Sequence, residues 1–398
     1  MKTVTDPRQI EEVLTKGVEI IYPNKETLRK ELLSGRRLRL YCGFDPSAPT
    51  LHIGNAIQLR KLGQFQRLGH EVIMLIGDFT GMIGDPTDKS AARKKLSRKE
   101  VIKNAKNYKK LASLFISFEG KNPAKILYNS KWSDKISFID LIDITANFTV
   151  QQMIVRDMFQ KRIEEKKPIF LHEFLYPVAQ GYDSVAMDVD LEIGGNDQIF
   201  NMLCGRDLMK AMKNKEKFVL GNKLLADPTG KKMGKSEGNM VTLDEKPAEM
   251  YGKVMSWPDE LLRTSFEICT DLSLEGIENV FRKGLSPRDL KAMLAKEIVK
   301  TCHGEKLAII AEEEFNKIFR ENILPTDIPE VKIFNTSLNI LDLLVQTKMA
   351  SSKSEAKRLV LQKGVRISDK IEDDWKKTIK ISPGIIIRVG NRRFVKIV

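Results

Sequence analysis

Short apolar runs alternate with longer segments of helical periodicity through the first half of the chain. Residues 38–42, 71–76, 125–128 and 189–193 form runs with the length and apolar content of buried strands. Between the first two runs, residues 56–68 carry apolar side chains at helical spacing. Strands that alternate with helices predict an α/β fold with a Rossmann-like parallel sheet.

Outside the predicted sheet the pattern is mostly helical. Asp6-Pro7 predicts the start of a first helix, which ends at Gly17. Ser97 and Glu100 form a capping box for a lysine-rich helix that extends to about Phe115. Other helices are expected at residues 25–33, 258–269, 274–282, 287–302 and 306–319. A sheet domain therefore precedes a mainly helical region.

The end of the chain has a different pattern. Pro325 and Pro329 indicate a linker, and short strands and one basic helix at 352–362 follow it. We predict four parts: a Rossmann-like domain with a helical insertion at 1–243, an all-α domain at 244–324, a linker at 325–336 and a small α+β module at 337–398. A length of 398 residues agrees with two or three domains.

Positive charge is concentrated in the last module. The chain has 67 Lys and Arg against 53 Asp and Glu, a net charge of +14. From Ser337 onward there are 14 basic and 6 acidic residues, which gives +8 in this short segment. Such a balance favours RNA binding, although a merely basic tail domain remains possible. Lys353, Lys357 and Arg358 are the candidate contacts on the outward face of the basic helix.

Composition also argues against several classes of protein. No apolar run has the length of a membrane span, and Asp6, Glu11 and Glu12 occur early without an apolar segment after them. We therefore expect a cytoplasmic protein with no membrane contact. The four cysteines and four histidines are scattered without the spacing of metal ligands, so we expect free thiols and no protein metal site.

The stretch 40–55 has the composition of a nucleotide-binding turn. It reads Leu-Tyr-Cys-Gly-Phe-Asp-Pro-Ser-Ala-Pro-Thr-Leu-His-Ile-Gly-Asn and joins the first predicted strand to the following helix. A helix that begins at His52 would present free N–H groups and its positive dipole end to phosphates. The turn therefore predicts a phosphate site at the carboxyl end of this strand.

A second candidate for phosphate binding lies far downstream. Lys232-Met233-Gly234-Lys235-Ser236 combines two lysines, a glycine and a hydroxyl. Most lysine-rich loops are simply solvated. Together with the first motif, however, this segment suits a clamp on a triphosphate, because two cationic groups and a hydroxyl donor can be directed at its oxygens.

Other polar residues fall where a pocket is expected. Tyr176, Gln180 and Asp183 recur at positions i, i+4 and i+7, which is one face of a helix. A glycine-rich loop that ends in Gly84-Asp85-Pro86 follows the second strand, and Gly194-Gly195-Asn196-Asp197-Gln198 follows a later one. Ligand contacts in such folds lie outside the carboxyl ends of strands.

These motifs together resemble those of class I aminoacyl-tRNA synthetases, and in particular the bacterial tyrosyl type. The likeness spans about residues 38–243 and is weaker beyond. It implies ATP-dependent activation of L-tyrosine to tyrosyl-adenylate and transfer of the tyrosyl group to the 3′-terminal adenosine of its tRNA. A homodimer is implied as well, and apolar residues such as Phe138 in the helical insertion could line its interface.

The resemblance also implies roles for individual residues. Tyrosine would be held by Tyr41, Asp85, Tyr176, Gln180, Asp183 and Gln198. ATP would be held by Asp45, Ser47, His52, Gly54, Asn55, Gly195, Asp197, Lys232, Met233, Lys235 and Ser236. The groups expected to be catalytic are His52, Lys89, Arg93, Lys232, Lys235 and Ser236, and Mg²⁺ would arrive with ATP. Tyr41 and Asp183 would recognise the phenol hydroxyl, by a rule of which tyrosyl-tRNA synthetase is itself the established example.

The chain departs from the usual motifs at a few positions. Asn55 stands in place of a second histidine, Gly234 in place of a serine and Ile199 in place of a tryptophan that many relatives carry. The alternatives are a tryptophanyl-tRNA synthetase, an adenylate-forming ligase similar to pantothenate synthetase, and a non-catalytic RNA-binding relative. The Tyr41 and Asp183 pair disfavours the first, and the C-terminal module disfavours the second.

Overall fold

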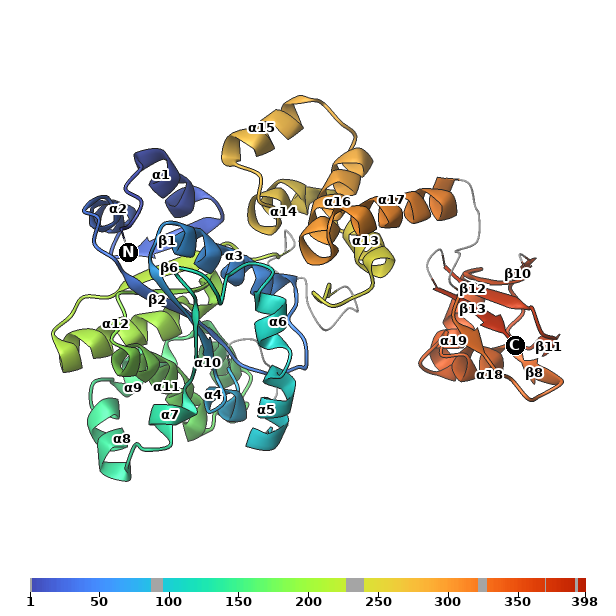
Figure 1. Ribbon diagram of the computed structural model, residues 1–398. Coiled ribbons are helices and arrows are strands. Elements are labelled where there is room, and N and C mark those ends of the chain that lie inside the picture. The colour runs from blue at the N-terminus through green and yellow to red at the C-terminus, as the bar shows by residue number, and fades with distance from the viewer. Residues whose placement is uncertain (1, 87–95, 227–239, 321–327, 369, 391–392) are drawn as a thin grey trace. The chain divides into compact units, whose positions relative to one another are not determined.

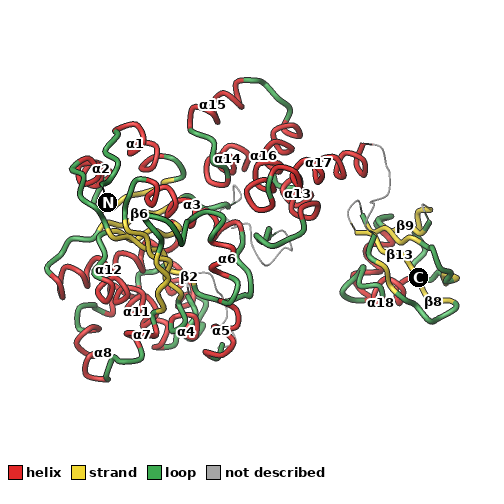
Figure 2. The backbone as a smooth tube through the Cα atoms, in the orientation of Figure 1, coloured by secondary structure: helices red, strands yellow, loops and turns green. Residues whose placement is uncertain are grey.

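The computed structural model describes residues 2–86, 96–226, 240–320, 328–368, 370–390 and 393–398. It divides into two compact units, Met1–Glu305 and Lys306–Val398. Figure 1 shows a sheet surrounded by helices in the first unit and a small β-rich body in the second. The path of the helices and strands can be followed in Figure 2.

The first unit is built on a six-stranded sheet. Its strands run in the order β1 (Val18–Tyr22), β6 (Phe218–Asn222), β5 (Leu191–Gly195), β2 (Arg39–Phe44), β3 (Glu71–Ile76) and β4 (Lys125–Tyr128). All neighbouring strands are parallel except β1 and β6. The predicted α/β class and its four predicted strands are confirmed, while β1 and β6 were not predicted.

The strand order creates a switch point at the middle of the sheet. The chain passes from β2 through α3 (Ile53–Arg67) to β3 on one side, and from β5 through α12 (Ile199–Lys213) to β6 on the other. The two crossovers run in opposite directions along the sheet, and because such crossovers are right-handed as a rule, we expect the two helices on opposite faces. The loops that follow β2 and β5 therefore border one crevice, where ligands of open α/β sheets bind.

Local sequence explains where several helices begin. Asp6 accepts hydrogen bonds from the N–H groups of Arg8 and Gln9 and caps α1 (Pro7–Thr15). Asn24 caps α2 (Lys25–Leu33) in the same way. These two N-terminal helices agree with their predicted starting residues.

One predicted helix is wrong. Ser97 and Glu100 form the expected capping box, but the segment to Phe115 is two helices, α5 (Arg98–Ala105) and α6 (Tyr108–Ala112). The break lies at Asn107, a poor helix former. The remaining helices before α12 are α4 (Thr80–Ile83), α7 (Ser130–Ser133), α8 (Phe138–Thr145), α9 (Val150–Ile154), α10 (Asp157–Glu164) and α11 (Leu171–Met187).

The helical region packs on the sheet domain through α3. It comprises α13 (Pro247–Met255), α14 (Leu262–Cys269), α15 (Leu274–Arg282) and α16 (Pro287–His303), and α17 (Glu305–Arg320) follows. From α3, Arg60 donates to the carbonyl oxygen of Cys269 at 3.1 Å and forms an ion pair with Asp271. Lys61 donates to the carbonyl oxygens of Val13 and Lys16, both at 2.7 Å. Buried cations thus join α3 to α1 and α14.

The second unit has its own hydrophobic core. A five-stranded sheet has the order β10 (Lys370–Glu372), β9 (Val365–Ile367), β12 (Ile386–Val389), β13 (Arg393–Ile397) and β7 (Glu330–Val331), and β11 (Thr378–Lys380) pairs with β8 (Ser337–Asn339). Helices α18 (Ile340–Gln346) and α19 (Lys353–Leu361) supply buried residues such as Leu344 and Val360. Strand β7 lies within the range 325–336, and the predicted domain boundaries stay predictions.

Candidate active site

A polar network occupies the crevice at the carboxyl ends of the central strands. Asp45, directly after β2, accepts from Thr80 Oγ1 at 2.6 Å and from the Tyr176 hydroxyl at 2.8 Å. Only glycine fits beside this carboxylate, because a Cβ at Gly77 would lie 1.9 Å from Asp45 Oδ1. The structure therefore brings together two predicted site residues from distant parts of the chain.

The carboxylate of Asp183 lies deeper in the same network. It is 2% exposed and accepts from Trp132 Nε1 at 2.7 Å and from Asn129 Nδ2 at 3.2 Å. The Asn129 amide also donates to Thr80, which links Asp183 to the Asp45 cluster. Burial raises the pKa of Asp183 well above its ordinary value, while the two hydrogen bonds act in the opposite direction.

Tyr41 lies in the middle of β2, near Asp183. Its ring is fully buried among Ile73, Leu75 and Met187, and its hydroxyl lies 2.9 Å from Ser184 Oγ. Burial and the nearby carboxylates raise the pKa of Tyr41, so the hydroxyl keeps its proton. The structure thus brings a phenol hydroxyl and a carboxylate to one region, as predicted.

The third helix-face residue, Gln180, points to strand β5. Its amide donates to Glu192 Oε1 at 3.0 Å. Tyr176, Gln180 and Asp183 all lie on α11, which confirms the helix inferred from their spacing. Their partners lie in the loop after β2, in β5 and in α7, so the helix face borders one side of the crevice.

A second polar group forms where β5 ends. Gln198 Nε2 donates to Asp85 Oδ2 at 2.7 Å and contacts Asp197 Oδ2 at 3.3 Å. The close approach of Asp197 requires glycine at 195, since a Cβ there would lie 2.3 Å from Asp197 Oδ1. Asp85, Asp197 and Gln198 therefore lie together, although they come from two loops.

The start of α3 is held by its own side chains and by a distant segment. The His52 N–H donates to Asn55 Oδ1 at 3.0 Å, so Asn55 takes part in capping the helix. His52 pairs with Thr242, and the Ile53 N–H donates to the carbonyl oxygen of Val241 at 3.0 Å. A Cβ at Gly54 would lie 3.0 Å from the His52 ring.

The remaining predicted residues lie in loops or outside the described ranges. Ser47 is exposed in the loop after β2, and its N–H donates to the carbonyl oxygen of Asp45 at 2.7 Å. Lys89, Arg93, Lys232, Met233, Gly234, Lys235 and Ser236 lie outside the described residues. The chain is described again from Met240, and this returning segment is the one that contacts His52.

Sequence reasoning missed several side chains of the network. Thr80, Asn129 and Trp132 each donate to a predicted site carboxylate or link two of them. Asn129 directly follows β4, and Thr80 follows the loop after β3. Polar residues at the carboxyl ends of predicted parallel strands are a signal that could have identified both.

The predicted RNA contacts lie on the second unit. Lys353, Lys357 and Arg358 are exposed on α19, whereas Ala356 is fully buried, as the pattern predicted. The Lys357 ammonium lies 4.1 Å from the centre of the Trp375 ring. The module therefore has a cationic helix face beside a partly exposed aromatic ring.

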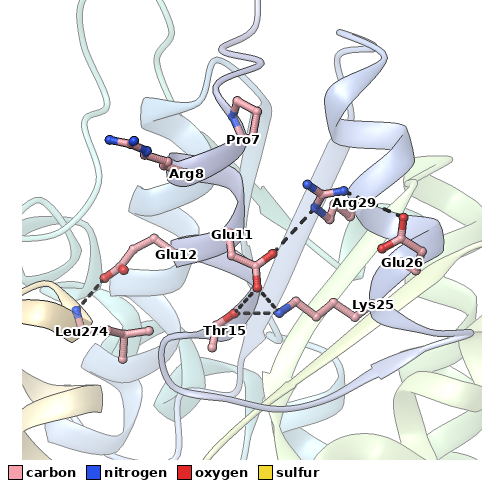
Figure 3. Close-up of a pocket in the computed structure, with 9 residues that line it drawn as sticks. All are labelled: Pro7, Arg8, Glu11, Glu12, Thr15, Lys25, Glu26, Arg29 and Leu274. Carbon is pink, nitrogen blue, oxygen red and sulfur yellow. Dashed lines mark hydrogen bonds and ion pairs between the residues drawn. The ribbon is translucent and has the colours of Figure 1, made fainter.

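A separate pocket of about 860 Å³ shares no residue with this network. It is lined by α1, α2 and Leu274 (Figure 3). Glu11 pairs with Lys25 and Arg29, Glu26 pairs with Arg29, and Glu12 accepts from the Leu274 N–H at 3.2 Å. We assign it no role in the chemistry.

Two features are absent from the described residues. In that part of the chain, no group of three or more His, Cys, Asp or Glu side chains could hold a metal ion. None of the helices in the same described ranges is long and apolar enough to cross a bilayer.

Comparison with known proteins first identifies the class. The family described as tRNA synthetases class I (W and Y) matches residues 33–320, which contain the sheet, the crevice and the helices that follow. A second family, the tyrosine–tRNA ligase SYY-like C-terminal domain, matches residues 321–396. The fold is thus that of a class I tRNA synthetase, and the chain belongs to this class.

Individual relatives identify the branch. The chain is 41% identical to tyrosine–tRNA ligase of Moorella thermoacetica, covering 97% of this chain and 94% of the relative. It is 42% identical to tyrosine–tRNA ligase of Thermotoga maritima, covering 98% of each. The chain belongs to the tyrosine–tRNA ligase family, of the bacterial type.

A solved structure supports the fold alone. The truncated mitochondrial tyrosyl-tRNA synthetase of Aspergillus nidulans superposes with a TM-score of 0.67 at 20% identity, covering 78% of this chain and 94% of that one.

The prediction of tyrosine activation and tRNA charging is confirmed by the family. The tryptophanyl and pantothenate-synthetase-like alternatives are not favoured.

Proposed function

We propose that the crevice after β2 and β5 binds L-tyrosine and ATP and forms tyrosyl-adenylate there. The observation that carries this proposal is the buried pairing of polar groups around Asp183 and Tyr41. The phenol group of the substrate would enter between them. Its hydroxyl would donate to the Asp183 carboxylate and accept from the Tyr41 hydroxyl. Phenylalanine would leave these buried groups unsatisfied.

The other end of the substrate would be held by a second set of side chains. We assign the ammonium group of tyrosine to Asp85, Tyr176 and Gln180, with Gln198 beside them. Support comes from their position around one crevice and from the carboxylate of Asp85, which can pair with a cation. The substrate carboxylate would then point toward the start of α3.

The reaction itself needs positioned charge more than a proton-transfer residue. A carboxylate oxygen of tyrosine attacks the α-phosphorus of ATP, a new P–O bond forms, and the bond to the β-phosphate oxygen breaks as pyrophosphate leaves. We assign His52, Ser47 and the α3 N-terminus to the phosphates, together with Lys89, Arg93, Lys232, Lys235 and Ser236. Mg²⁺ would be carried by the nucleotide, because it binds readily to substrate phosphates.

The nucleoside would occupy the space between α3 and the end of β5. Gly54 lacks a side chain where the base approaches, and Asp45, Asn55, Gly195, Asp197 and Met233 are the other proposed contacts. In the second step, a hydroxyl of the terminal adenosine of tRNA attacks the carbonyl carbon of the adenylate, and AMP leaves. We propose the cytoplasm as the location of this reaction.

The C-terminal module would hold the tRNA by its backbone. Lys353, Lys357 and Arg358 are the proposed contacts, supported by their shared exposed face on α19. Within the proposed division of the chain, residues 1–243 perform catalysis, 244–324 face the anticodon region and 337–398 bind RNA after a linker at 325–336.

We also propose a homodimer formed through the helical insertion. Large apolar side chains are exposed from α8 to the start of α11: Phe138 at 79%, Ile139 at 62%, Val150 at 70%, Val155 at 61% and Leu171 at 82%. Several exposed large apolar side chains within one segment are typical of interfaces. Replacing Phe138 and Leu171 by aspartate should convert a dimer to a monomer in sedimentation. A monomeric starting protein would contradict this.

The central test is tyrosine-dependent exchange of pyrophosphate into ATP. The full-length protein should catalyse exchange with tyrosine. The exchange rate with phenylalanine or tryptophan should be lower by orders of magnitude. Exchange with tryptophan instead would overturn the assignment of the pocket. Charging of tRNA with labelled tyrosine tests the second step independently.

A further inference from the structure

A buried ion pair lies behind the Tyr41 hydroxyl and takes no part in the chemistry described above. Lys217, just before β6, is fully buried and pairs with Glu192 of β5, which is 1% exposed. The Lys217 ammonium also donates to Ser184 Oγ at 2.8 Å. Lys217, Glu192 and Ser184 therefore form a buried polar cluster next to the crevice.

The packing of the sheet and helices is adapted to this cluster. Gly205 of α12 lies against it, and a Cβ at this position would be 2.5 Å from Lys217 Nζ and 2.8 Å from Ser184 Oγ. Helix α11 approaches α12 closely at the same level, since a Cβ at Gly181 would lie 3.0 Å from the Gly205 nitrogen. Two glycines thus leave the space that the polar cluster fills.

Both ends of the cluster touch residues assigned to the tyrosine pocket. Ser184 Oγ lies 2.9 Å from the Tyr41 hydroxyl, and Glu192 Oε1 accepts from Gln180 at 3.0 Å. A purely structural ion pair would have no need of these contacts, because Lys217 and Glu192 already satisfy each other's charge. The cluster is therefore connected to both the phenol end and the amino end of the pocket.

The number of protons on these groups indicates a direction for the hydrogen bonds. The Ser184 hydroxyl has one proton, and one of its lone pairs already accepts from Lys217. Its proton can go to Tyr41 at 2.9 Å or to Glu192 Oε2 at 3.4 Å. The shorter contact favours Tyr41, and Glu192 Oε2 already accepts from Lys217.

This direction has a consequence for the substrate. If Ser184 donates to the Tyr41 oxygen, the Tyr41 O–H is directed away from Ser184. Glu192 is then its acceptor within the cluster, and the oxygen of a bound phenol would be its acceptor on the side of the crevice. The two oxygens of Asp183 accept hydrogen bonds from Trp132 and Asn129. A carboxylate has no proton to donate, so it can only act as the acceptor for a bound hydroxyl. A bound hydroxyl would then meet one donor and one acceptor, which matches a phenol and not a bare ring.

We propose that Lys217 and Glu192, acting through Ser184, are positioning residues that set the Tyr41 hydroxyl as the donor to the substrate phenol and hold Gln180 in place. The inference rests on the proposed function, because it assumes that Tyr41 binds the phenol. None of the three residues touches the substrate. They would act on selectivity and tyrosine binding rather than on the phosphoryl step.

The test is a double-mutant cycle between Ser184 and Tyr41. Ser184→Ala, Tyr41→Phe and the double variant are compared in tyrosine- and phenylalanine-dependent pyrophosphate exchange. Ser184→Ala should raise KM for tyrosine about tenfold and lower the tyrosine/phenylalanine ratio of kcat/KM by a similar factor. The kcat and the KM for ATP should change less than about twofold. In the Tyr41→Phe background, Ser184→Ala should have no further effect on selectivity.

Additional variants test the ion pair itself. Lys217→Met alone leaves Glu192 buried without a partner and risks misfolding, so the neutral Glu192→Gln/Lys217→Met double variant is measured beside it. It should reproduce the loss of selectivity. Lys215→Met is the matched control, since Lys215 pairs with Asp188 and Asp190 outside the pocket and its loss should leave the kinetics unchanged.

The outcomes separate this inference from the proposed function. Additive effects of Ser184→Ala and Tyr41→Phe, or a loss of kcat without a change in tyrosine KM, would overturn the positioning role while tyrosine activation stands. Absence of tyrosine-dependent exchange in the unmodified protein would instead overturn the proposed function. Thermal unfolding of each variant shows whether its fold is retained.

Discussion

Asp183 shows how much one buried carboxylate can determine. Asn129 and Trp132, which donate to it, come from the end of β4 and the helix after it, so its position depends on elements more than 50 residues away. A carboxylate in this setting stays in place only because its hydrogen bonds offset part of the cost of burial. The same bonds leave it able to recognise a hydroxyl donor.

Asp183→Ala should therefore reduce selectivity more than activity with phenylalanine. We expect the tyrosine/phenylalanine ratio of kcat/KM to fall by roughly tenfold to a hundredfold, the cost of one unpaired buried polar group. Pyrophosphate exchange with each amino acid measures this ratio. Asp188→Asn, at the exposed end of the same helix, is the control and should leave it unchanged. Unaltered selectivity in Asp183→Ala would remove the residue from the hydroxyl site.

Two glycines should respond oppositely to the same added methyl group. At Gly77 a Cβ would lie 1.9 Å from Asp45 Oδ1, so Gly77→Ala must displace the carboxylate that Thr80 and Tyr176 contact. We expect a loss of about 1–3 kcal/mol in unfolding free energy and a large loss of exchange activity. Gly252 lies within α13 with no atom within 4 Å of the added Cβ.

Gly252→Ala is thus the matched control, and it should stabilise the protein by about 0.5–1 kcal/mol because alanine favours the helix. Chemical denaturation measures both changes in free energy, and pyrophosphate exchange measures activity. Equal stability of the two variants would contradict the packing around Asp45.

At the residue scale, the sequence indicated some of the site and could not indicate the rest. The i, i+4, i+7 spacing predicted that Tyr176, Gln180 and Asp183 share a helix face, because that geometry depends on local backbone only. It could not indicate the partners Trp132 and Glu192. Their contacts depend on how separate elements pack, and one sequence contains no direct signal for that.

Among the elements, the connection from α3 to β3 contains a buried histidine. His70 is fully buried, and its Nδ1 accepts from the Leu38 N–H at 3.2 Å, which joins this connection to the start of β2. Burial, followed by the nearby Arg37 guanidinium, lowers the pKa of His70 from 6.5 to about 4. The neutral ring is therefore the form that the folded protein contains.

This pKa predicts loss of stability in acid. Between pH 6.5 and 4 the unfolded chain binds a proton at His70 that the folded chain does not, so unfolding free energy falls as pH decreases. Below both pKa values, the loss of unfolding free energy from this shift reaches about 3 kcal/mol. His70→Asn keeps an acceptor for Leu38 but does not titrate, so the acid-dependent loss should be smaller in urea denaturation at pH 7 and pH 4.5.

Exposed His172 provides the control for this measurement, and His172→Asn should follow the unmodified protein at both pH values. If His70→Asn loses as much stability in acid as the unmodified chain, the histidine is not the source of the effect.

Elements differed in how well sequence predicted them. Strands β3 and β4 were predicted at their observed bounds, because each is a compact apolar or mixed run between clear breaks. Strand β1 was missed, since its five residues form a strand only by antiparallel pairing with β6, about 200 residues later. The α5–α6 break was also missed, because a single asparagine is a weak local signal.

On the scale of the whole molecule, charge is distributed unevenly between the two units. The C-terminal module has an excess of basic residues, and α19 presents three of them on its exposed face beside Trp375. A phosphate backbone would release counterions on binding there, so affinity for tRNA should fall with salt.

Reversing these three charges should weaken tRNA binding without affecting amino-acid activation. We expect Lys353→Glu/Lys357→Glu/Arg358→Glu to raise the KM for tRNA at least about tenfold and to reduce the slope of log affinity against log salt. Tyrosine-dependent exchange, which needs no tRNA, should be unchanged. Charging kinetics and filter binding across a salt series measure the two effects.

The control carries the same change in charge on exposed residues of the first unit, Lys2→Glu/Arg8→Glu/Lys30→Glu. It should retain most of the tRNA affinity and the original salt slope. Equal weakening in both triple variants would mean that total charge, and not the α19 face, governs binding.

Chemical labelling of Lys61, the buried lysine of α3, would measure how often α1 separates from α3. Lys61 is 4% exposed and donates to the carbonyl oxygens of Val13 and Lys16 at the end of α1. Burial lowers its pKa to about 7. The lowered pKa belongs to the buried amine, which a reagent cannot reach while α1 packs on α3. An amine-selective reagent should modify Lys61 only when α1 detaches from α3. Where α1 packs back faster than the reagent reacts, the labelling rate measures the free energy of that local opening in the intact native protein.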